Sequence, residues 1–231
     1  YNGSLQTNSG ASYSGQQGGD SFTITGYATG TDYSPTSYAD NLSVSGSALN
    51  NYDVTYQNGS LSIGKASLSI TGHNTTTTYN GSLQSNTYTV DGLKGSDAVT
   101  GVDGLASGTD YRAVAYADNL SNVQGTGLSN YTVTYQNGSL SIGKASLVVT
   151  GANNAVTYNG SLQSNSGASY SGQKGSDSFT ITGYATGTDY SPTSYADNLS
   201  VSGTSLSNYD VTYQNGSLSI GKASLSITGR N

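Results

Sequence analysis

The stretch Thr-Tyr-Gln-Asn-Gly-Ser-Leu-Ser-Ile-Gly-Lys-Ala-Ser-Leu occupies residues 55–68 and occurs again at 134–147 and at 212–225. A second stretch, Tyr-Asn-Gly-Ser-Leu-Gln, also occurs three times and starts at Tyr1, Tyr79 and Tyr158. Regular internal copying of this kind is typical of an array of small structural units and not of one large domain. The sequence therefore predicts three tandem repeats.

We divide the chain into repeat one (1–72), repeat two (73–151) and repeat three (152–231). The phase of the repeat is open, because the strand sequence after each lysine of the stretch either ends its own repeat or begins the following one. These lysines are Lys65, Lys144 and Lys222. Repeats one and three are nearly identical. They differ at these pairs: Thr7/Ser164, Gln17/Lys174, Gly19/Ser176, Ser47/Thr204, Ala48/Ser205 and Asn50/Ser207.

Apolar and polar residues alternate throughout each repeat, and no stretch holds the 3.6-residue period of a helix. Clean alternation predicts strands with one buried face, as in antiparallel sheets. In repeat one the alternating apolar sets are Phe22/Ile24, Leu42/Val44, Tyr52/Val54/Tyr56, Leu61/Ile63 and Leu68/Ile70. We expect an all-β fold of mostly antiparallel small β domains, with the three repeats in an elongated rod.

Turn signals separate these runs. Asn58-Gly59 lies between two of them and recurs at Asn137-Gly138 and Asn215-Gly216, and Asn-Gly is the strongest short signal for a β-hairpin. We therefore expect a hairpin at each Asn-Gly. The Leu61 and Leu68 runs have opposite parity, and a bulge or a change of facing at Gly64 would explain the difference. Such a short junction favours a stiff array.

The composition excludes several classes of function. The chain has 13 acidic residues, 7 Lys plus Arg and a net charge of −6, and it has no basic cluster of the kind that nucleic acid requires. It has no Cys, so disulfides and thiolate metal sites are excluded. No apolar run approaches the length of a membrane-spanning helix. We expect a monomer whose partners are its own neighbouring repeats, with no nucleic acid and no membrane span.

Three aspartates recur in every repeat and are the candidate metal ligands. One interpretation is that they supply hydrogen bonds in the turns Gly-Thr-Asp and Ala-Asp-Asn. The alternative is a calcium site, since Ca²⁺ takes six to eight oxygen ligands, although no Asp-x-Asp-x-Asp-Gly loop is present. The nine candidates are Asp20, Asp32, Asp40, Asp97, Asp110, Asp118, Asp177, Asp189 and Asp197. We expect no other cofactor.

No catalytic constellation recurs in the repeats. His73 is the only histidine, so a Ser-His-Asp triad cannot form in every repeat. The three recurrent lysines could form isopeptide bonds with Asn, but that chemistry needs a buried acid beside the pair, and a polar role at the strand junction is preferred. The tyrosines Tyr38, Tyr52 and Tyr56 alternate with polar residues, which favours core packing over sugar binding. We expect no enzyme and no catalytic residues.

The order of these motifs resembles the YDG and MBG-type repeats of large bacterial haemagglutinin-like surface adhesins. In repeat two the matching residues are Lys144, Tyr79-Asn80-Gly81, Gly95-Ser96-Asp97, Ala117-Asp118-Asn119 and 130–142. The resemblance covers the whole chain, although Tyr-Asn-Gly stands where the family name has Tyr-Asp-Gly. It implies a mostly-β module in secreted proteins that project from the bacterial cell surface and act in adhesion, aggregation or biofilm formation. It implies no catalytic residues.

Two functions follow from the repeat and the resemblance. The first is a structural stalk or spacer that extends the distal binding region of a secreted cell-surface adhesin. The alternative is that the repeats themselves bind a glycan, a host surface protein or like arrays on another cell.

Overall fold

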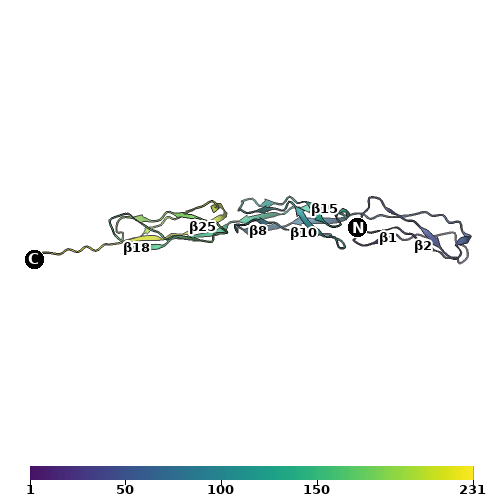
Figure 1. Cartoon of the computed structure of the whole chain (residues 1–231), viewed down its shortest axis with the longest axis horizontal. Helices are drawn as coiled ribbons and strands as arrows, with labels where there is room; N and C mark the ends of the chain where they lie inside the picture. The colour runs from purple at the N-terminus through teal and green to yellow at the C-terminus, as the bar shows by residue number, and fades with distance from the viewer. Residues whose placement is uncertain (231) are drawn as a thin grey trace. The chain divides into compact units, whose positions relative to one another are not determined.

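The computed structural model describes residues 1–230, and it is all-β (Figure 1). Short strands and three single-turn 3₁₀ helices are linked by extended loops. The chain folds into two units, each of which contains segments from different parts of the sequence. Unit 1 consists of Tyr1–His73, Thr87–Leu105 and Asp118–Gly138. Unit 2 consists of Asn74–Asn86, Ala106–Ala117 and the described residues from Ser139 onwards.

Unit 1 contains all of the strands before Asn74 and several strands of repeat two. In chain order these are β1 (Gln6–Thr7), β2 (Thr23–Thr25), β3 (Thr29–Gly30), β4 (Tyr38–Ala39), β5 (Ser43–Ser45), η1 (Leu49–Asn51), β6 (Ser60–Leu61), β7 (Ala66–Gly72), β10 (Tyr88–Asp91), β11 (Val99–Asp103), β14 (Ser121–Gly125), η2 (Leu128–Asn130) and β15 (Tyr131–Gln136). Its sheets are β10-β7-β15 and the pairs β1-β3, β2-β5, β4-β6 and β11-β14.

Unit 2 contains the remaining strands. In chain order these are β8 (Asn74–Thr78), β9 (Gln84–Ser85), β12 (Ser107–Gly108), β13 (Tyr116–Ala117), β16 (Ser139–Gly143), β17 (Ala145–Thr150), β18 (Asn153–Thr157), β19 (Gln163–Ser164), β20 (Ser169–Ser171), β21 (Thr180–Thr182), β22 (Thr186–Gly187), β23 (Tyr195–Ala196), β24 (Ser200–Ser202), η3 (Leu206–Asn208), β25 (Tyr209–Gln214) and β26 (Ser217–Gly221). Its sheets are β20-β17-β25, β18-β26-β23 and β13-β16-β8, with pairs β12-β9, β19-β22 and β21-β24.

Most strand pairs are antiparallel, as the alternation predicts, but four central pairs are parallel. In unit 1, β15 runs parallel to β7. In unit 2, β16 runs parallel to β8, β25 to β17 and β26 to β18. Parallel partners need a long connection between them, and here most of a repeat separates the two members of each pair.

The hairpins predicted at Asn-Gly are wrong. In repeat three, β25 and β26 lie on either side of Asn215-Gly216 but belong to different sheets, so the chain continues forward and does not reverse. Neither residue has the positive φ of a hairpin turn. The Asn215 side chain instead accepts a hydrogen bond from the Leu199 amide at 3.2 Å. Gly216 is required for a different reason, since a Cβ there would collide with the carbonyl oxygen of Ala152.

The strand that follows each of the first two recurrent lysines pairs with the next repeat. β7, which lies in repeat one by the division at residue 72, takes both of its partners, β10 and β15, from repeat two. β17, at the end of repeat two, pairs with β20 and β25 of repeat three. The change of facing expected at Gly64 thus coincides with the passage from β6 to β7. The boundaries themselves stay predictions.

The core of each unit lies around a donated strand, which is a strand that pairs with the repeat after its own (β7 or β17). In unit 1, Leu68 and Ile70 of β7 are fully buried and pack with Leu120 and Tyr131. In unit 2, Leu147 and Val149 of β17 are fully buried and belong to a larger cluster. The other buried members of that cluster are Tyr79, Ala106, Leu140, Ile142, Ala145, Phe179, Leu199, Val201 and Tyr209. Within residues 1–230, no helix has the length and apolar character needed to cross a membrane.

Candidate functional site

The first recurrent aspartate joins two successive repeats through tyrosine hydroxyls. In unit 1 the Tyr1 hydroxyl donates to Asp97 Oδ2 at 2.6 Å, and the Tyr131 hydroxyl donates to the same oxygen at 2.8 Å. The two rings meet edge to face, with centroids 5.5 Å apart. The bond to the Asp97 carboxylate is the main cause that raises the pKa of Tyr1 to about 12. Tyr1 comes from repeat one, so this cluster is an inter-repeat junction.

The same junction forms in unit 2 between repeats two and three. The hydroxyls of Tyr79 and Tyr209 donate to Asp177 Oδ2 at 2.8 and 2.6 Å. Burial and then the bond to Asp177 raise the pKa of Tyr209 to about 12. Burial acts to raise the pKa of Asp177, but the hydrogen bonds led by Tyr209 outweigh it, and the net shift is downward. These are charge-assisted bonds, which are shorter and stronger than neutral ones.

The second recurrent aspartate makes another inter-repeat contact. In unit 1 the side chain of Asn130 donates to Asp32 Oδ1 at 2.9 Å, and the amide of Tyr33 donates to Asn130 Oδ1 at 2.8 Å. In unit 2, Asn208 bonds Asp110 and the Tyr111 amide at 2.9 and 2.8 Å. The asparagine belongs to the following repeat in both cases. Each junction is therefore held by two separate polar contacts.

The recurrent lysines lie over tyrosine rings close to the second recurrent aspartate. The Nζ atoms of Lys65, Lys144 and Lys222 are 4.9, 5.1 and 4.8 Å from the ring centroids of Tyr33, Tyr111 and Tyr190. This is the geometry of a cation–π contact. Lys144 also lies 3.5 Å from Asp210. The structure thus places each lysine over an aromatic face next to the Thr-Asp-Tyr loop.

The third recurrent aspartate is buried and binds backbone amides. In repeat one the Asp40 carboxylate accepts bonds from the amides of Ala28 and Gly59, at 2.7 and 3.1 Å, and from the Asn8 side chain. The Ala28 amide and then Asn8 hold the pKa of Asp40 below its usual value. Asp197 has the equivalent set in repeat three, and Asp118 accepts from the Gly138 amide. This residue fastens the chain within each repeat.

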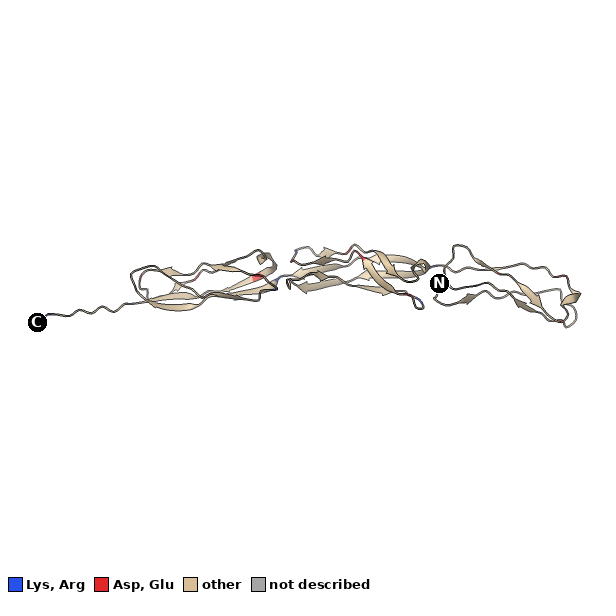
Figure 2. Ribbon diagram, viewed as in Figure 1, with Lys and Arg blue, Asp and Glu red and all other residues tan. Residues whose placement is uncertain are grey.

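The structure does not bring the nine candidate calcium ligands together. Within residues 1–230, no three acidic or histidine side chains lie close enough to hold a metal ion. The acidic residues are few and scattered along the ribbon (Figure 2). The oxygens of the buried aspartates face N–H donors, which a cation would have to displace. Their partners are side chains and amides distant in sequence, so the bonds are not the local turn bonds expected.

The remaining candidates have structural contacts. His73 Nδ1 lies 2.8 Å from the Thr87 hydroxyl. Tyr38 and Tyr52 are half-buried, whereas Tyr131 and Tyr209, the equivalents of Tyr52, are buried in the core. The core position predicted for Tyr56 is wrong, because its side chain is 51% exposed and its equivalents are exposed as well.

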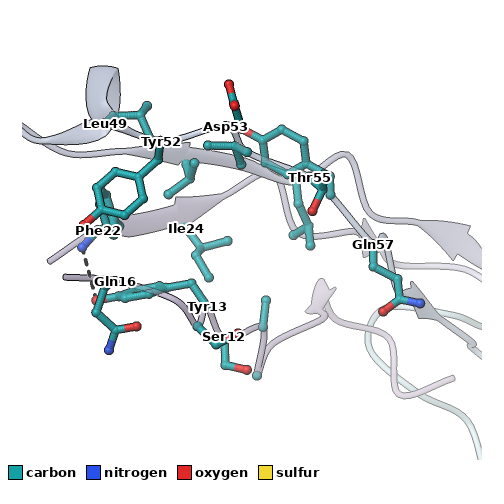
Figure 3. A pocket seen from close by; sticks show the side chains of 17 residues that line it. Ser12, Tyr13, Gln16, Phe22, Ile24, Leu49, Tyr52, Asp53, Thr55 and Gln57 are labelled. Atoms are coloured by element: carbon teal, nitrogen blue, oxygen red, sulfur yellow. Dashed lines mark hydrogen bonds between the residues drawn. The ribbon is translucent and has the colours of Figure 1, made fainter. Parts of the chain in front are cut away.

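Repeat one carries a groove that is lined by both polar and apolar side chains. The groove has a volume of about 570 Å³ and runs between residues 10–14 and 52–57. Figure 3 shows Tyr13 and Tyr52 on its two sides, with Phe22 and Ile24 between them. Its apolar lining also includes Leu42, Val44 and Val54.

No protein-family model, curated protein or solved structure matches this chain.

Sequence reasoning found the aspartates but missed their tyrosine and asparagine partners. The missed junction residues are the tyrosines that begin the first two Tyr-Asn-Gly stretches and the asparagines before Tyr131 and Tyr209. The available signal was that both residue types recur at equivalent positions. Hydrogen bonds across nearly 100 residues have no local pattern that would pair them.

Proposed function

We propose that the chain consists of spacer repeats from the stalk of a secreted bacterial cell-surface adhesin, which hold a distal binding region away from the cell. The observation that carries this proposal is the recurrence of the same Tyr–Asp and Asn–Asp bonds at both inter-repeat junctions. A repeated junction lets each added repeat attach to its neighbour in the same way. The motif resemblance supports the cell-surface location.

The chemistry of the junction side chains also favours a mechanical role. The junction aspartates accept hydrogen bonds from tyrosine hydroxyls. The bond to Asp97 is the main cause that raises the pKa of Tyr1 to about 12, and burial followed by the bond to Asp177 raises the pKa of Tyr209 to about 12, so both hydroxyls stay protonated up to high pH. Such groups are poor bases and poor nucleophiles at neutral pH. They are well suited to fixing one repeat against the next, because they act together with the Asn–Asp hydrogen bond and with the strand that pairs with the next repeat.

Small-angle scattering on the full chain tests the spacer role. We expect an extended particle with a narrow cross-section. The double variant Asp97→Asn with Asp177→Asn weakens both tyrosine junctions, and we expect a broader distance distribution from it. Asp189→Asn is the matched control, since it changes an exposed recurrent aspartate outside both junctions. A compact profile for the unaltered chain would contradict the proposal.

A second experiment tests the spacer function by cell-surface display. The chain is inserted between a membrane anchor and a small binding domain, and capture of ligand-coated beads is measured with and without the insert. We expect better capture with the insert on cells that carry a thick surface polysaccharide. Specific, saturable binding of a glycan or host protein by the chain alone would instead favour the alternative function.

A further inference from the structure

The parallel strand pairs join the first strands of a folded segment to its last strands. In residues 66–143, β7 and β8 come first, and they run parallel to β15 and β16, which end the segment. In residues 145–221, β17 and β18 come first and run parallel to β25 and β26. Lys144 alone separates the two segments. The beginning and the end of each segment are therefore paired in the same way.

A pull on the chain loads these pairs along their length. Tension enters the second segment at Ala145, where β17 begins, and leaves it at Gly221, where β26 ends. Ala145 lies opposite Tyr209, and Thr150 lies opposite Gln214, so tension draws β17 and β25 in opposite directions along their common axis. The bonds of a parallel pair are evenly spaced, so they share this load and have to break together.

These pairs are also the most extensive in the chain. The β7–β15 and β17–β25 pairs each extend over six residues, and the β8–β16 and β18–β26 pairs extend over five. Antiparallel pairs formed by the residues between them are shorter, since β21–β24 extends over three residues and β12–β9 over two. The longest pairing thus lies on the path of the tension.

Side chains at the start of the last strands resist sliding. Tyr209 begins β25 and is buried, and its hydroxyl accepts from the Lys174 amide at 2.7 Å and donates to Asp177 at 2.6 Å. Tyr131 makes the equivalent bonds at the start of β15. A slip of one residue would also turn the fully buried Leu147 of β17 to the opposite face of its sheet. Sliding therefore breaks hydrogen bonds and exposes core residues at the same time.

We propose that the parallel pairs form a mechanical clamp in each segment, so that the chain bears tension between its ends without unfolding. The clamp of residues 66–143 consists of β7–β15 and β8–β16, and the clamp of residues 145–221 consists of β17–β25 and β18–β26. This function rests on the proposed spacer role, because a stalk comes under tension when its distal region is bound. It goes beyond that role, since a spacer needs only length.

The first test pulls the clamp of residues 145–221 in two directions by single-molecule force spectroscopy. The chain contains no cysteine, so pairs of introduced cysteines give unique attachment points. Ser146→Cys with Gln214→Cys puts the anchors at opposite ends of the β17–β25 pair and loads it in shear. Ser146→Cys with Asp210→Cys puts them directly opposite each other and peels the strands apart. All three positions are exposed, so the core is unchanged.

We expect shear to need at least about a threefold higher force than peeling at the same loading rate, because the bonds of the pair act together. Both geometries release nearly the same stretch of chain, at about 3.3–3.6 Å per residue, so the same event is compared. Equal forces in the two geometries overturn the proposal.

The second test separates the clamp from general stability by making one truncation at two places. Val149 lies in β17 and Val201 lies in β24, and both are buried in the same core cluster. β24 pairs with β21 and lies outside the clamp. Val149→Ala and Val201→Ala remove the same atoms from the core, so we expect both to lower the stability measured in denaturant.

Under shear from the same anchors, the two variants should behave differently. We expect Val149→Ala to speed unfolding under force at least about fivefold and Val201→Ala to change it less than about twofold, because only the contacts of the clamp are lost when it yields. Equal acceleration by the two substitutions contradicts a clamp at β17.

Failure of the clamp and failure of the spacer role give different results. Equal forces in the two pulling directions would leave an extended stalk without a clamp. A compact scattering profile would instead remove the stalk and leave the force measured on residues 145–221 unchanged.

Discussion

Repeats one and three differ in burial although their sequences are almost the same. Phe179, Leu199, Val201 and Tyr209 are buried in repeat three. Their counterparts in repeat one, Phe22, Leu42, Val44 and Tyr52, are only half-buried. None of the six differences between the repeats falls on these positions. The burial of the same side chains therefore depends on a strand supplied from outside the repeat.

Strand donation explains this difference. β17 covers the apolar face of repeat three and adds its own Leu147 and Val149 to the core. Burying such a side chain contributes about 1.5–3 kcal/mol. Small domains bury only a modest apolar core, so one donated strand contributes a large part of the stability of a repeat. Stability in this chain is consequently shared between neighbours, as in other repeat proteins.

The largest effect is expected from removing the donated strand of repeat three. Leu147→Asp places a carboxylate at a fully buried position, which costs several kcal/mol. We expect β17 to leave its sheet and repeat three to become as exposed as repeat one. Hydrogen exchange of residues 209–214 measures this loss. Leu225→Asp, at the equivalent but exposed position, is the control and should leave the folding of the dilute chain unchanged; equal effects of the two would refute strand donation.

The sequence predicted the strands but not their partners. The alternation at Leu68/Ile70 correctly indicated a strand with one buried face, and both residues are fully buried. A period of two says nothing about which neighbour covers that face, so the donation of β7 to repeat two stayed one of two open phases. Identical residues in repeat one and repeat three necessarily gave identical predictions, although their burial differs.

The hairpins predicted at the Asn-Gly pairs are wrong for a physical reason. Asn-Gly favours hairpins because both residues accept positive φ, but here each Asn side chain caps a backbone amide and each Gly makes room for a close approach. Close approach and positive φ both select glycine, and sequence cannot distinguish them. The junction aspartates were found because they recur, whereas their partners in the neighbouring repeat lie almost 100 residues away.

A second prediction compares the same truncation in the two repeats. Leu199→Ala empties a buried position and should cost about 2–5 kcal/mol of unfolding free energy. Leu42→Ala removes the same atoms from a half-buried position and should cost about 1 kcal/mol. Denaturant unfolding followed by a probe in each repeat gives both values. Similar costs would mean that the two cores are equally well packed, which would contradict the difference in burial between Leu199 and Leu42.

The third prediction concerns the backbone of the unaltered chain. Residues 209–214 are hydrogen-bonded to β17, whereas residues 52–57 form no strand. We expect amides in 52–57 to exchange at least about tenfold faster than their counterparts, because exposed backbone lies at the low-stability end. Mass spectrometry can separate the two, since peptides that include Asn50 or Ser207 differ in mass. Dilute protein should be used, and equal exchange rates would remove the contrast between the repeats.

The smallest effect is expected on tyrosine ionisation. Asp177 accepts from two tyrosines, Tyr79 and Tyr209, whereas Asp20 accepts from Tyr52. The hydrogen bond from the Gln17 amide acts to lower the pKa of Tyr52. The bond from the Tyr52 hydroxyl to Asp20 and the burial of Tyr52 raise it, and the net shift is upward. Burial and Asp177 raise the pKa of Tyr209 to about 12. Absorbance at alkaline pH should therefore show Tyr209 ionising well above a free tyrosine, whose pKa is about 10.

The sign of the stability change follows from these shifts. A pKa of Tyr209 raised in the folded state gives stability that is complete below a pH of about 10 and is lost as the pH rises towards about 12. The lowered pKa of Asp177 gives stability that is present above the ordinary aspartate pKa and is lost on acidification below it. Asp177→Asn should lower the apparent pKa of Tyr209 and reduce the alkaline loss, whereas Asp20→Asn should leave Tyr209 unchanged. If the apparent pKa of Tyr209 is the same in Asp177→Asn as in the unaltered chain, the carboxylate does not hold this junction.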